Sequence, residues 1–277
     1  MNFLHCGRFR LPLDRPLVMG IINVTPDSFS GDGLAGDAAR ALEQARRFAE
    51  EGADILDIGG ESSRPGAEPV SAQDELRRVL PVIEALRDLP LPLSIDTMKP
   101  EVMRAAVAAG ASMINDIRAL QAPGAIEAAA GCDAGVCLMH MQGEPRTMQA
   151  DPVYSDVVKE VGEFLVERAE VARRAGIAAE RICIDPGFGF GKTAEHNLEL
   201  LRGLDALCGL GYPVLVGLSR KSVLGKLTGR KVTERMAASV TAALSAVARG
   251  ARIVRVHDVA ATRDALAVWR VAGLPGA

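Results

Sequence analysis

Three polar residues stand where apolar runs of the sequence end. Asp96 follows the run PLSI, Asn115 follows SMI, and Asp185 follows RICI. Two carboxylates and an amide without a neighbouring histidine base make a poor nucleophilic triad. They suit the edge of a flat heterocycle with amino and amide groups, because a carboxylate accepts two N–H donors and an amide both donates and accepts. The alternative is that these carboxylates only cap the helices that follow them.

Cationic side chains gather after the last two apolar runs of the chain. The segment 219–222 (SRKS) follows PVLVGL and contains Lys221, whose ammonium is suited to the face of an aromatic ring. Arg255 and His257 stand two residues apart at the end of RIVRV, so both point to the same side of a strand. A solvated basic surface would explain isolated cations. Two clusters at neighbouring strand ends instead favour a site for an anion.

Three further segments are rich in turn formers. The segment 23–33 holds Phe29 among hydroxyl groups and glycines, which is typical of a mobile lid with an aromatic tip, although a solvated turn is the plainer interpretation. Its first residue, Asn23, offers a neutral oxygen suited to Mg²⁺ that substrate phosphates also bind. The segment 59–66 (GGESSRPG) allows close approach of a ligand and suits an anion, unless it is only a structural loop. The segment 186–192 (PGFGFGK) predicts a backbone close to an aromatic ligand.

These clusters follow eight apolar, strand-like runs, and a helix-compatible segment follows each run. The runs are 17–22, 54–58, 92–95, 112–114, 134–139, 181–184, 213–218 and 252–256. Helical patterns cover 37–51, 71–88, 100–109, 123–130, 154–175, 194–208, 233–249 and 259–271. Strands that alternate with helices favour parallel pairing through crossover connections. We therefore predict an α/β fold, a (β/α)8 (TIM) barrel in which all strand ends with polar clusters open on one mouth.

The barrel is expected to be a single domain over residues 1–277. No linker-like shift in composition divides the chain, and residues 1–16 (with FLHC–GR–FRLP) predict a short hairpin across the N-terminal mouth. A doubly wound open sheet would also alternate strands and helices. That fold usually carries a GxGxxG turn after its first strand, and none follows Asn23.

Composition excludes several classes of protein. A hydrophobic content of 48% is ample for a closed core, and a net charge of −3 gives no general attraction to nucleic acid or an anionic membrane. No apolar stretch approaches the roughly 18 residues of a membrane span, and Arg and Pro interrupt the N-terminus before a signal sequence forms, so we expect a cytoplasmic protein. Five cysteines without CxxC spacing predict buried reduced thiols, and four histidines without HxH or HExxH argue against zinc.

Read in order, the polar segments resemble the dihydropteroate synthase family of the folate pathway. The matching segments are NVTPDSFS (23–30), GGESSRPGA (59–67), IDT (95–97), NDI (115–117), DPGFGFGK (185–192), SRKS (219–222) and RVHDV (255–259). They run from the first predicted strand to the last. DPGFGFGK together with SRKS and RVHDV is very specific, whereas the lone aspartates are not.

The resemblance implies a homodimeric (β/α)8 transferase that joins 4-aminobenzoate to 6-hydroxymethyl-7,8-dihydropterin diphosphate, releases diphosphate, and is a target of sulfonamides. The residues implied to hold the pterin are Asp96, Asn115, Asp185 and Lys221. Those implied to hold the diphosphate are Ser63, Arg255 and His257, with Asn23 as a ligand of Mg²⁺. Those implied to border 4-aminobenzoate are Phe190, Lys221 and Ser222, with Phe29, Arg64 and Pro65 on mobile loops. The implied catalytic residues are Lys221, Arg255, His257, Asp96 and Asp185.

The implied mechanism needs no protein nucleophile. Mg²⁺, Arg255 and His257 neutralise charge on the departing diphosphate, while the electron-rich pterin stabilises a cation at the exocyclic carbon that the arylamine attacks. The family is known for this dissociative route, and the sequence does not distinguish it from direct displacement. Two departures from the family pattern are small: Ser63 replaces a frequent Thr, and Gly-Asp-Gly at 31–33 replaces Asp-Gly-Gly.

Two other functions fit part of the pattern. The pterin-binding barrel of corrinoid methyltransferases resembles this family around the Asp and Asn contacts, but has no use for the diphosphate cluster or the lid loop. A paralogue that binds pterin without catalysis is the alternative outside enzymes. The presence of Lys221, Arg255 and Asn23 together favours the synthase.

Overall fold

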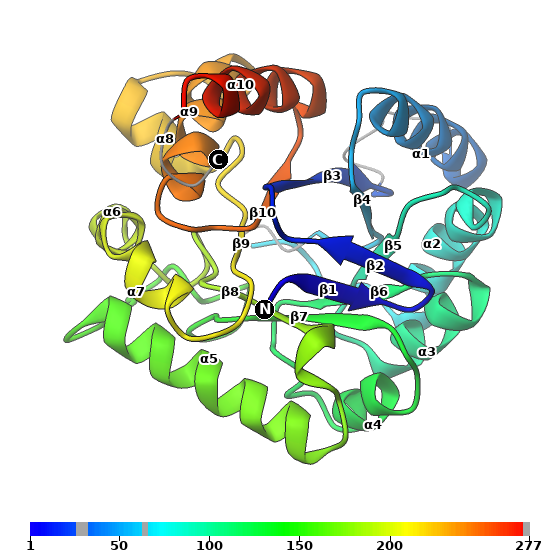
Figure 1. Cartoon of the computed structure of the whole chain (residues 1–277). Coiled ribbons are helices and arrows are strands. Elements are labelled where there is room, and N and C mark those ends of the chain that lie inside the picture. Colours follow the sequence, from blue (N-terminus) through cyan, green and yellow to red (C-terminus); the bar gives the residue numbers. More distant parts are fainter. Residues whose placement is uncertain (26–32, 63–65, 274–277) are drawn as a thin grey trace.

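Eight parallel strands form a closed barrel in the computed structural model, which describes residues 1–25, 33–62 and 66–273 (Figure 1). The strands are β3 (Leu17–Asn23), β4 (Ile55–Gly59), β5 (Leu93–Asp96), β6 (Met113–Asp116), β7 (Gly135–Met139), β8 (Ile182–Asp185), β9 (Leu215–Val216) and β10 (Ile253–Val256). Their order is β8-β7-β6-β5-β4-β3-β10-β9, and a parallel bridge between Ile184 and Val214 joins the two edges. The predicted (β/α)8 barrel is confirmed, and the open sheet is wrong.

Helices form the outer ring in Figure 1. They are α1 (Gly33–Glu50), α2 (Ala72–Leu86), α3 (Pro100–Ala109), α4 (Ala125–Ala130), α5 (Val157–Arg174), α6 (Ala194–Arg202), α7 (Leu204–Cys208), α8 (Ser222–Thr228), α9 (Met236–Val247) and α10 (Val259–Val271). The single helix predicted at 194–208 is wrong, because the chain divides at Gly203. A side chain there would meet Val158 of α5 at 2.9 Å, so only glycine allows the close packing. The short helix α8 was not predicted.

The N-terminal hairpin consists of β1 (Phe3–Cys6) and β2 (Phe9–Pro12), paired antiparallel. Figure 1 shows it lying across the barrel opening, as the sequence predicts. Leu4 and Cys6 are fully buried against the interior. β7 begins with Gly135, where any side chain would approach the Cys6 sulfur within 2.7 Å, so the hairpin backbone and β7 touch directly.

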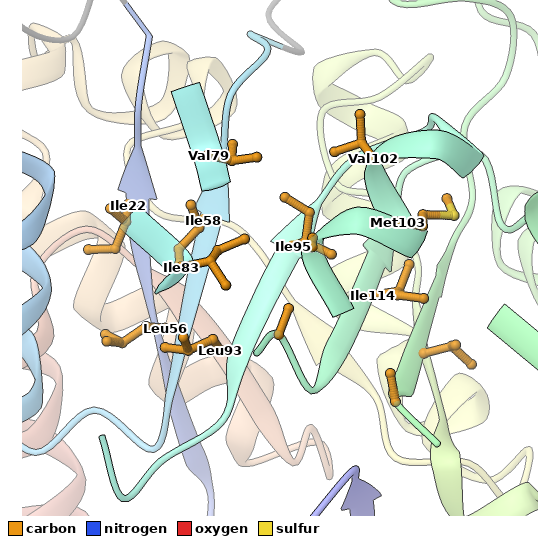
Figure 2. Packing of buried hydrophobic residues seen from close by; sticks show 14 of the residues in the cluster. Ile22, Leu56, Ile58, Val79, Ile83, Leu93, Ile95, Val102, Met103 and Ile114 are labelled. Carbon is orange, nitrogen blue, oxygen red and sulfur yellow. The ribbon is translucent and has the colours of Figure 1, made fainter. Parts of the chain in front are cut away.

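Alternate residues of each strand point outward and pack beneath the helices. Figure 2 shows this packing, in which strand residues meet α2 and α3. The residues labelled there are Ile22, Leu56, Ile58, Leu93, Ile95 and Ile114 from the strands, with Val79, Ile83, Val102 and Met103 from the helices. Each such side chain contributes roughly 1.5–3 kcal/mol on burial, so this shell fixes the strands.

The residues between them point into the barrel, whose interior changes character along the strands. The lower layer, next to the hairpin, is apolar and consists of Leu17, Met19, Ile55, Met113, Cys137, Cys183, Leu215 and Ile253. The upper layer, at the C-terminal strand ends, carries charged and amide side chains. All five cysteines are free thiols; three are buried, as predicted, and Cys132 and Cys208 are half-buried. Over the described ranges, no helix has the length and apolar character needed to cross a membrane.

Candidate active site

Arg255 is at the centre of a network that joins four strand ends. Its Nε donates to Oδ2 of Asp57 at 2.6 Å, and a terminal nitrogen donates to Oδ2 of Asp96 at 2.8 Å. The amide nitrogen of Asn115 donates to the same Asp57 oxygen at 3.0 Å. These residues come from β10, β4, β5 and β6, all at interior positions. The sequence-predicted residues Asp96, Asn115 and Arg255 therefore lie together, with Asp57 as the link.

Asp57 is the residue that sequence reasoning missed. It lies within the apolar run 54–58 (DILDI), where the pattern predicts an ordinary strand residue. It is fully buried, and within the described part of the chain its Oδ1 has no hydrogen-bond partner. A buried carboxylate is unfavourable unless a cation or donors face it, so a lone Asp at an interior-facing strand position is the signal that would have predicted such a network.

The network controls the charge of its members. Burial raises the pKa of Asp96 to about 7, which Arg255 opposes and neighbouring Asp57 reinforces. Burial alone would lower the pKa of Arg255, but Asp57 and Asp96 hold it above its ordinary value. Arg255 therefore stays charged, while Asp96 titrates near neutrality. A carboxyl group with this shift is typical of a functional site.

Asp185 and Lys221 form a second group on the other side of the mouth. Oδ1 of Asp185 accepts the backbone N–H of Gly187 at 2.7 Å. The ammonium of Lys221 donates to the carbonyl oxygen of Phe188 and lies 4.6 Å from the ring centroid of Phe190, which is a cation–π contact. Burial lowers the pKa of Lys221 to about 8 against the attraction of Asp185. Burial raises the pKa of Asp185, and Lys221 opposes that shift.

The two groups face each other across Gly217. A side-chain carbon at Gly217 would lie 3.8 Å from the Lys221 nitrogen and 3.9 Å from Cδ of Arg255. The alternative that Asp96 and Asp185 cap the following helices is wrong. The N-cap residues of α3 and α6 are Lys99 and Thr193.

His257 lies beside the SRKS segment. Its Nδ1 is 3.0 Å from Oγ of Ser219, and its backbone N–H donates to the same hydroxyl at 3.2 Å. Arg220, between Ser219 and Lys221, has a φ of 57° and pairs with Asp258 after β10. Ser222 begins α8 and is exposed. The last two strand ends are thus connected side chain to side chain, and the anion site stays a prediction.

The remaining predicted residues belong to the first two strand ends. Asn23 is the last residue of β3, half-buried, and Gly59 of β4 separates it from Asp96 in the strand register. Within the described ranges, no group of three His, Cys, Asp or Glu residues is placed to hold a metal ion. Phe29, Ser63, Arg64 and Pro65 lie outside the residues that the structure describes.

Fold and site together define a barrel enzyme whose mouth combines buried carboxylates, an amide and cations. The model of the pterin binding enzyme family matches residues 19–257, from the first barrel strand to just after the last. This match covers the network around Arg255 and the group around Lys221.

Three solved structures resemble the chain over almost its whole length. Xanthomonas albilineans dihydropteroate synthase with 4-aminobenzoic acid is 57% identical, with a TM-score of 0.93 and 98% of each chain covered. The Burkholderia cenocepacia enzyme complexed with 7,8-dihydropteroate is 55% identical, with a TM-score of 0.89 and coverage of 98% of this chain and 96% of that chain. The Yersinia pestis enzyme, in a complex with a sulfonamide drug, is 47% identical, with a TM-score of 0.93 and coverage of 98% and 99%. The chain belongs to the dihydropteroate synthase family and is a transferase that makes dihydropteroate.

Proposed function

We propose that the polar upper layer of the barrel binds the pterin ring of 6-hydroxymethyl-7,8-dihydropterin diphosphate. The observation that carries this proposal is the buried network of Asp57, Asn115, Arg255 and Asp96. Because Asn115 donates its N–H to Asp57, its amide oxygen is left to accept an N–H of the ring. Asp96 and Asp185 offer further acceptors to amino and ring N–H groups. This arrangement suits the edge of an aminopyrimidinone.

Lys221 and Phe190 would border the ring and the incoming arylamine. The ammonium of Lys221 lies over the Phe190 ring, so the pair presents a flat apolar face with a positive rim. Ser222 follows at the exposed start of α8. We place 4-aminobenzoate against this surface, with Phe29, Arg64 and Pro65 contributed by the first two loops. Sulfonamides would compete for the same surface as mimics of 4-aminobenzoate.

Arg255 and His257 would act on the diphosphate. The reaction breaks the bond between the exocyclic carbon and the diphosphate oxygen, forms a bond from that carbon to the arylamine nitrogen, and releases the extra proton of the amine. Arg255, held charged by two carboxylates, and His257 oppose the charge that develops on the leaving group. Ser63 would add a hydroxyl donor. The carboxylates of Asp96 and Asp185 near the ring favour positive charge on the pterin, which supports a dissociative route.

A magnesium ion fits the first strand end. The amide oxygen of Asn23 is a hard neutral ligand, and Mg²⁺ usually combines one or two protein ligands with water and substrate phosphates. When bound, the ion would neutralise charge on the diphosphate. Calorimetric titration of diphosphate with and without Mg²⁺ tests this, since Asn23→Ala is expected to remove most of the metal dependence. An Asn23→Ala protein with the same metal dependence as the parent would contradict the assignment.

We also propose a homodimer. Leu227 of α8, Met236 of α9, and Val268 and Val271 of α10 are exposed on adjacent helices, the last two by 70% and 90%. Such apolar side chains on one side of the barrel suit a second copy of the chain. Light scattering after size exclusion tests the assignment, and Val268→Glu is expected to give a monomer. The five free thiols support a reducing compartment, the cytoplasm.

An assay of diphosphate release with both substrates and Mg²⁺ tests the proposed activity directly. Mass spectrometry should detect dihydropteroate in the same amount as diphosphate. Tight pterin binding without release would instead support the paralogue that binds without catalysis. Release that does not depend on 4-aminobenzoate would show hydrolysis and contradict the proposed acceptor.

A further inference from the structure

Lys192, the last residue of DPGFGFGK, is buried at the mouth of the barrel although it is a lysine. It is 2% exposed. Its Nζ lies 2.9 Å from Nδ1 of His140, 2.9 Å from the carbonyl oxygen of Phe190 and 3.0 Å from that of Gly187. A fourth, longer contact of 3.4 Å reaches the carbonyl oxygen of His140, so acceptors surround all three protons of an ammonium group. These acceptors therefore hold the ammonium group in one position. The proposed function assigns Lys192 no contact with a substrate.

Among the acceptors around Nζ of Lys192, the imidazole of His140 belongs to a side chain. It follows β7, is 7% exposed, and packs edge-to-face against Phe164 of α5 with ring centroids 4.9 Å apart. Burial first, and then the charge of Lys192, lower the pKa of His140 to about 3. The imidazole is therefore neutral, and with its proton on Nε2 its Nδ1 accepts from Lys192. Burial also lowers the pKa of Lys192, and the charge of Asp185 opposes that shift.

Lys192 and His140 contact a tightly packed turn at residues 187–190. Gly187 has a φ of 68°, and a side-chain carbon there would lie 1.8 Å from the carbonyl oxygen of His140. The backbone N–H of Phe190 donates to the carbonyl oxygen of Gly187 at 3.1 Å, which closes the turn. Lys192 binds both carbonyl groups, Gly187 and Phe190, from the inside.

This turn is also the part of the chain that touches Asp185 and Lys221. The N–H of Gly187 is the donor to Asp185, and the carbonyl oxygen of Phe188 is the acceptor for Lys221. The ring of Phe190 lies under the Lys221 ammonium. Any displacement of the turn therefore moves both groups at once.

We propose that Lys192 and His140 form a buried clamp that sets the positions of Asp185 and Lys221, which makes Lys192 a positioning residue for the pterin site. The inference rests on the proposed roles of Asp185 and Lys221 in pterin binding. Lys192 acts through the turn and through its charge, which lowers the pKa of Asp185, so its removal disturbs one side of the mouth. The network around Arg255, on β4, β5, β6 and β10, keeps its geometry.

The substitution Lys192→Met tests the clamp, because it removes the ammonium and keeps most of the side-chain length. We expect pterin binding, measured by calorimetry, to weaken at least about tenfold, while the affinity for inorganic diphosphate with Mg²⁺ stays within about twofold. Lys159→Met, on the exposed face of α5, is the matched control and should change neither value. Loss of both affinities in equal measure would show a general folding defect and overturn the positioning role.

Two variants of His140 keep the lysine, and they test the clamp if Lys192→Met does not fold. His140→Asn retains an acceptor near the position of Nδ1 and is expected to keep pterin affinity close to that of the parent. His140→Leu removes the acceptor and should reproduce the selective loss. A parent protein that binds pterin, with Lys192→Met or His140→Leu binding it equally well, would overturn the clamp. A parent that fails to bind pterin would instead refute the proposed function.

Discussion

The lower interior of the barrel is filled with apolar side chains, whereas the upper interior, two residues further along the same strands, is filled with charge. Ile55 precedes Asp57 on β4, and Ile253 precedes Arg255 on β10. Each pair shares one strand and one facing direction. The apolar layer that stabilises the barrel and the polar layer that we expect to bind the ligand are thus separated by a single step of the strand period. The apolar layer and the outer shell hold the strands, and the upper layer can then keep an unfavourable cluster of buried charges.

Asp57→Ala is expected to have the largest effect, because it should lower both the stability of the fold and the affinity for pterin. It leaves Arg255 buried with one carboxylate instead of two and releases the amide of Asn115. Breaking a buried ion pair from one side costs about 3–5 kcal/mol. We expect urea unfolding to show a loss of this size, and calorimetry to show pterin binding at least about a hundredfold weaker. Asp57→Asn, which keeps one acceptor, should lose less. Parent-like pterin affinity in Asp57→Ala would remove the network from the binding site.

Ile55→Ala is the counterpart in the lower layer. Ile55 is fully buried, and truncating such a side chain lowers the free energy of unfolding by about 2–5 kcal/mol. Because it belongs to the apolar layer next to the hairpin, the KM for pterin diphosphate should stay within about twofold of the parent value. Steady-state kinetics below the melting temperature measures this. A large increase in KM would show that the two layers are not separate.

Asp185→Ala is expected to affect binding more than stability. The carboxylate accepts one backbone N–H and lies near Lys221, so the fold loses little. Ligand donors that face it would lose a charged acceptor, which costs at least about 2 kcal/mol in pterin binding. Calorimetry with pterin and thermal melting on the same preparation give both values. Unchanged pterin affinity would sink the assignment.

The pH dependence of kcat/KM gives the smallest and most specific effect. Burial raises the pKa of Asp96 to about 7 and lowers that of Lys221 to about 8, so activity should be highest between these values and fall about tenfold per pH unit outside them. Asp96→Asn should flatten the acid side. The free energy of unfolding changes in the opposite direction to activity. The folded state binds the Asp96 proton more tightly than the unfolded chain, so this group lowers stability as pH rises from its ordinary pKa of 3.8 to about 7, above which its contribution no longer changes. An acid limb that persists in Asp96→Asn would assign it to another group.

The sequence predicts the barrel well because each strand is marked twice, by an apolar run and by the polar residue that ends it. It also predicts that Asp96, Asn115 and Asp185 converge, with a separate cationic cluster at Arg255, since all strand ends of a barrel meet at one mouth. The structure instead joins Asp96 and Asn115 with Arg255 through Asp57, and places Asp185 beside Lys221. The sequence predicts that Lys221 suits the face of an aromatic ring, and the structure shows that this ring is Phe190.

The features that the sequence does not predict depend on contacts between residues far apart in the chain. The ion pair of Asp57 with Arg255 joins residues 198 positions apart, and an Asp within DILDI gives only the weak signal of a charge at an interior position. The break at Gly203 is set by Val158 on another helix. Lys192 looks like one more mouth cation in DPGFGFGK, and only the fold shows that it points inward to His140.

The closure of the barrel has a consequence for the response to ligand. β9 has two residues, and β8 meets this part of the chain through the bridge of Ile184 with Val214 and a hydrogen bond from Ile184 to Pro213. This is the weakest junction between neighbouring strands of the barrel, and Asp185 and Lys221 lie on its two sides. A ligand bound by both side chains therefore joins the two strands at this junction. Backbone amides at 184 and 214 should exchange with deuterium faster than those of β4 and β5 in the free protein, and should show the greatest slowing when pterin binds.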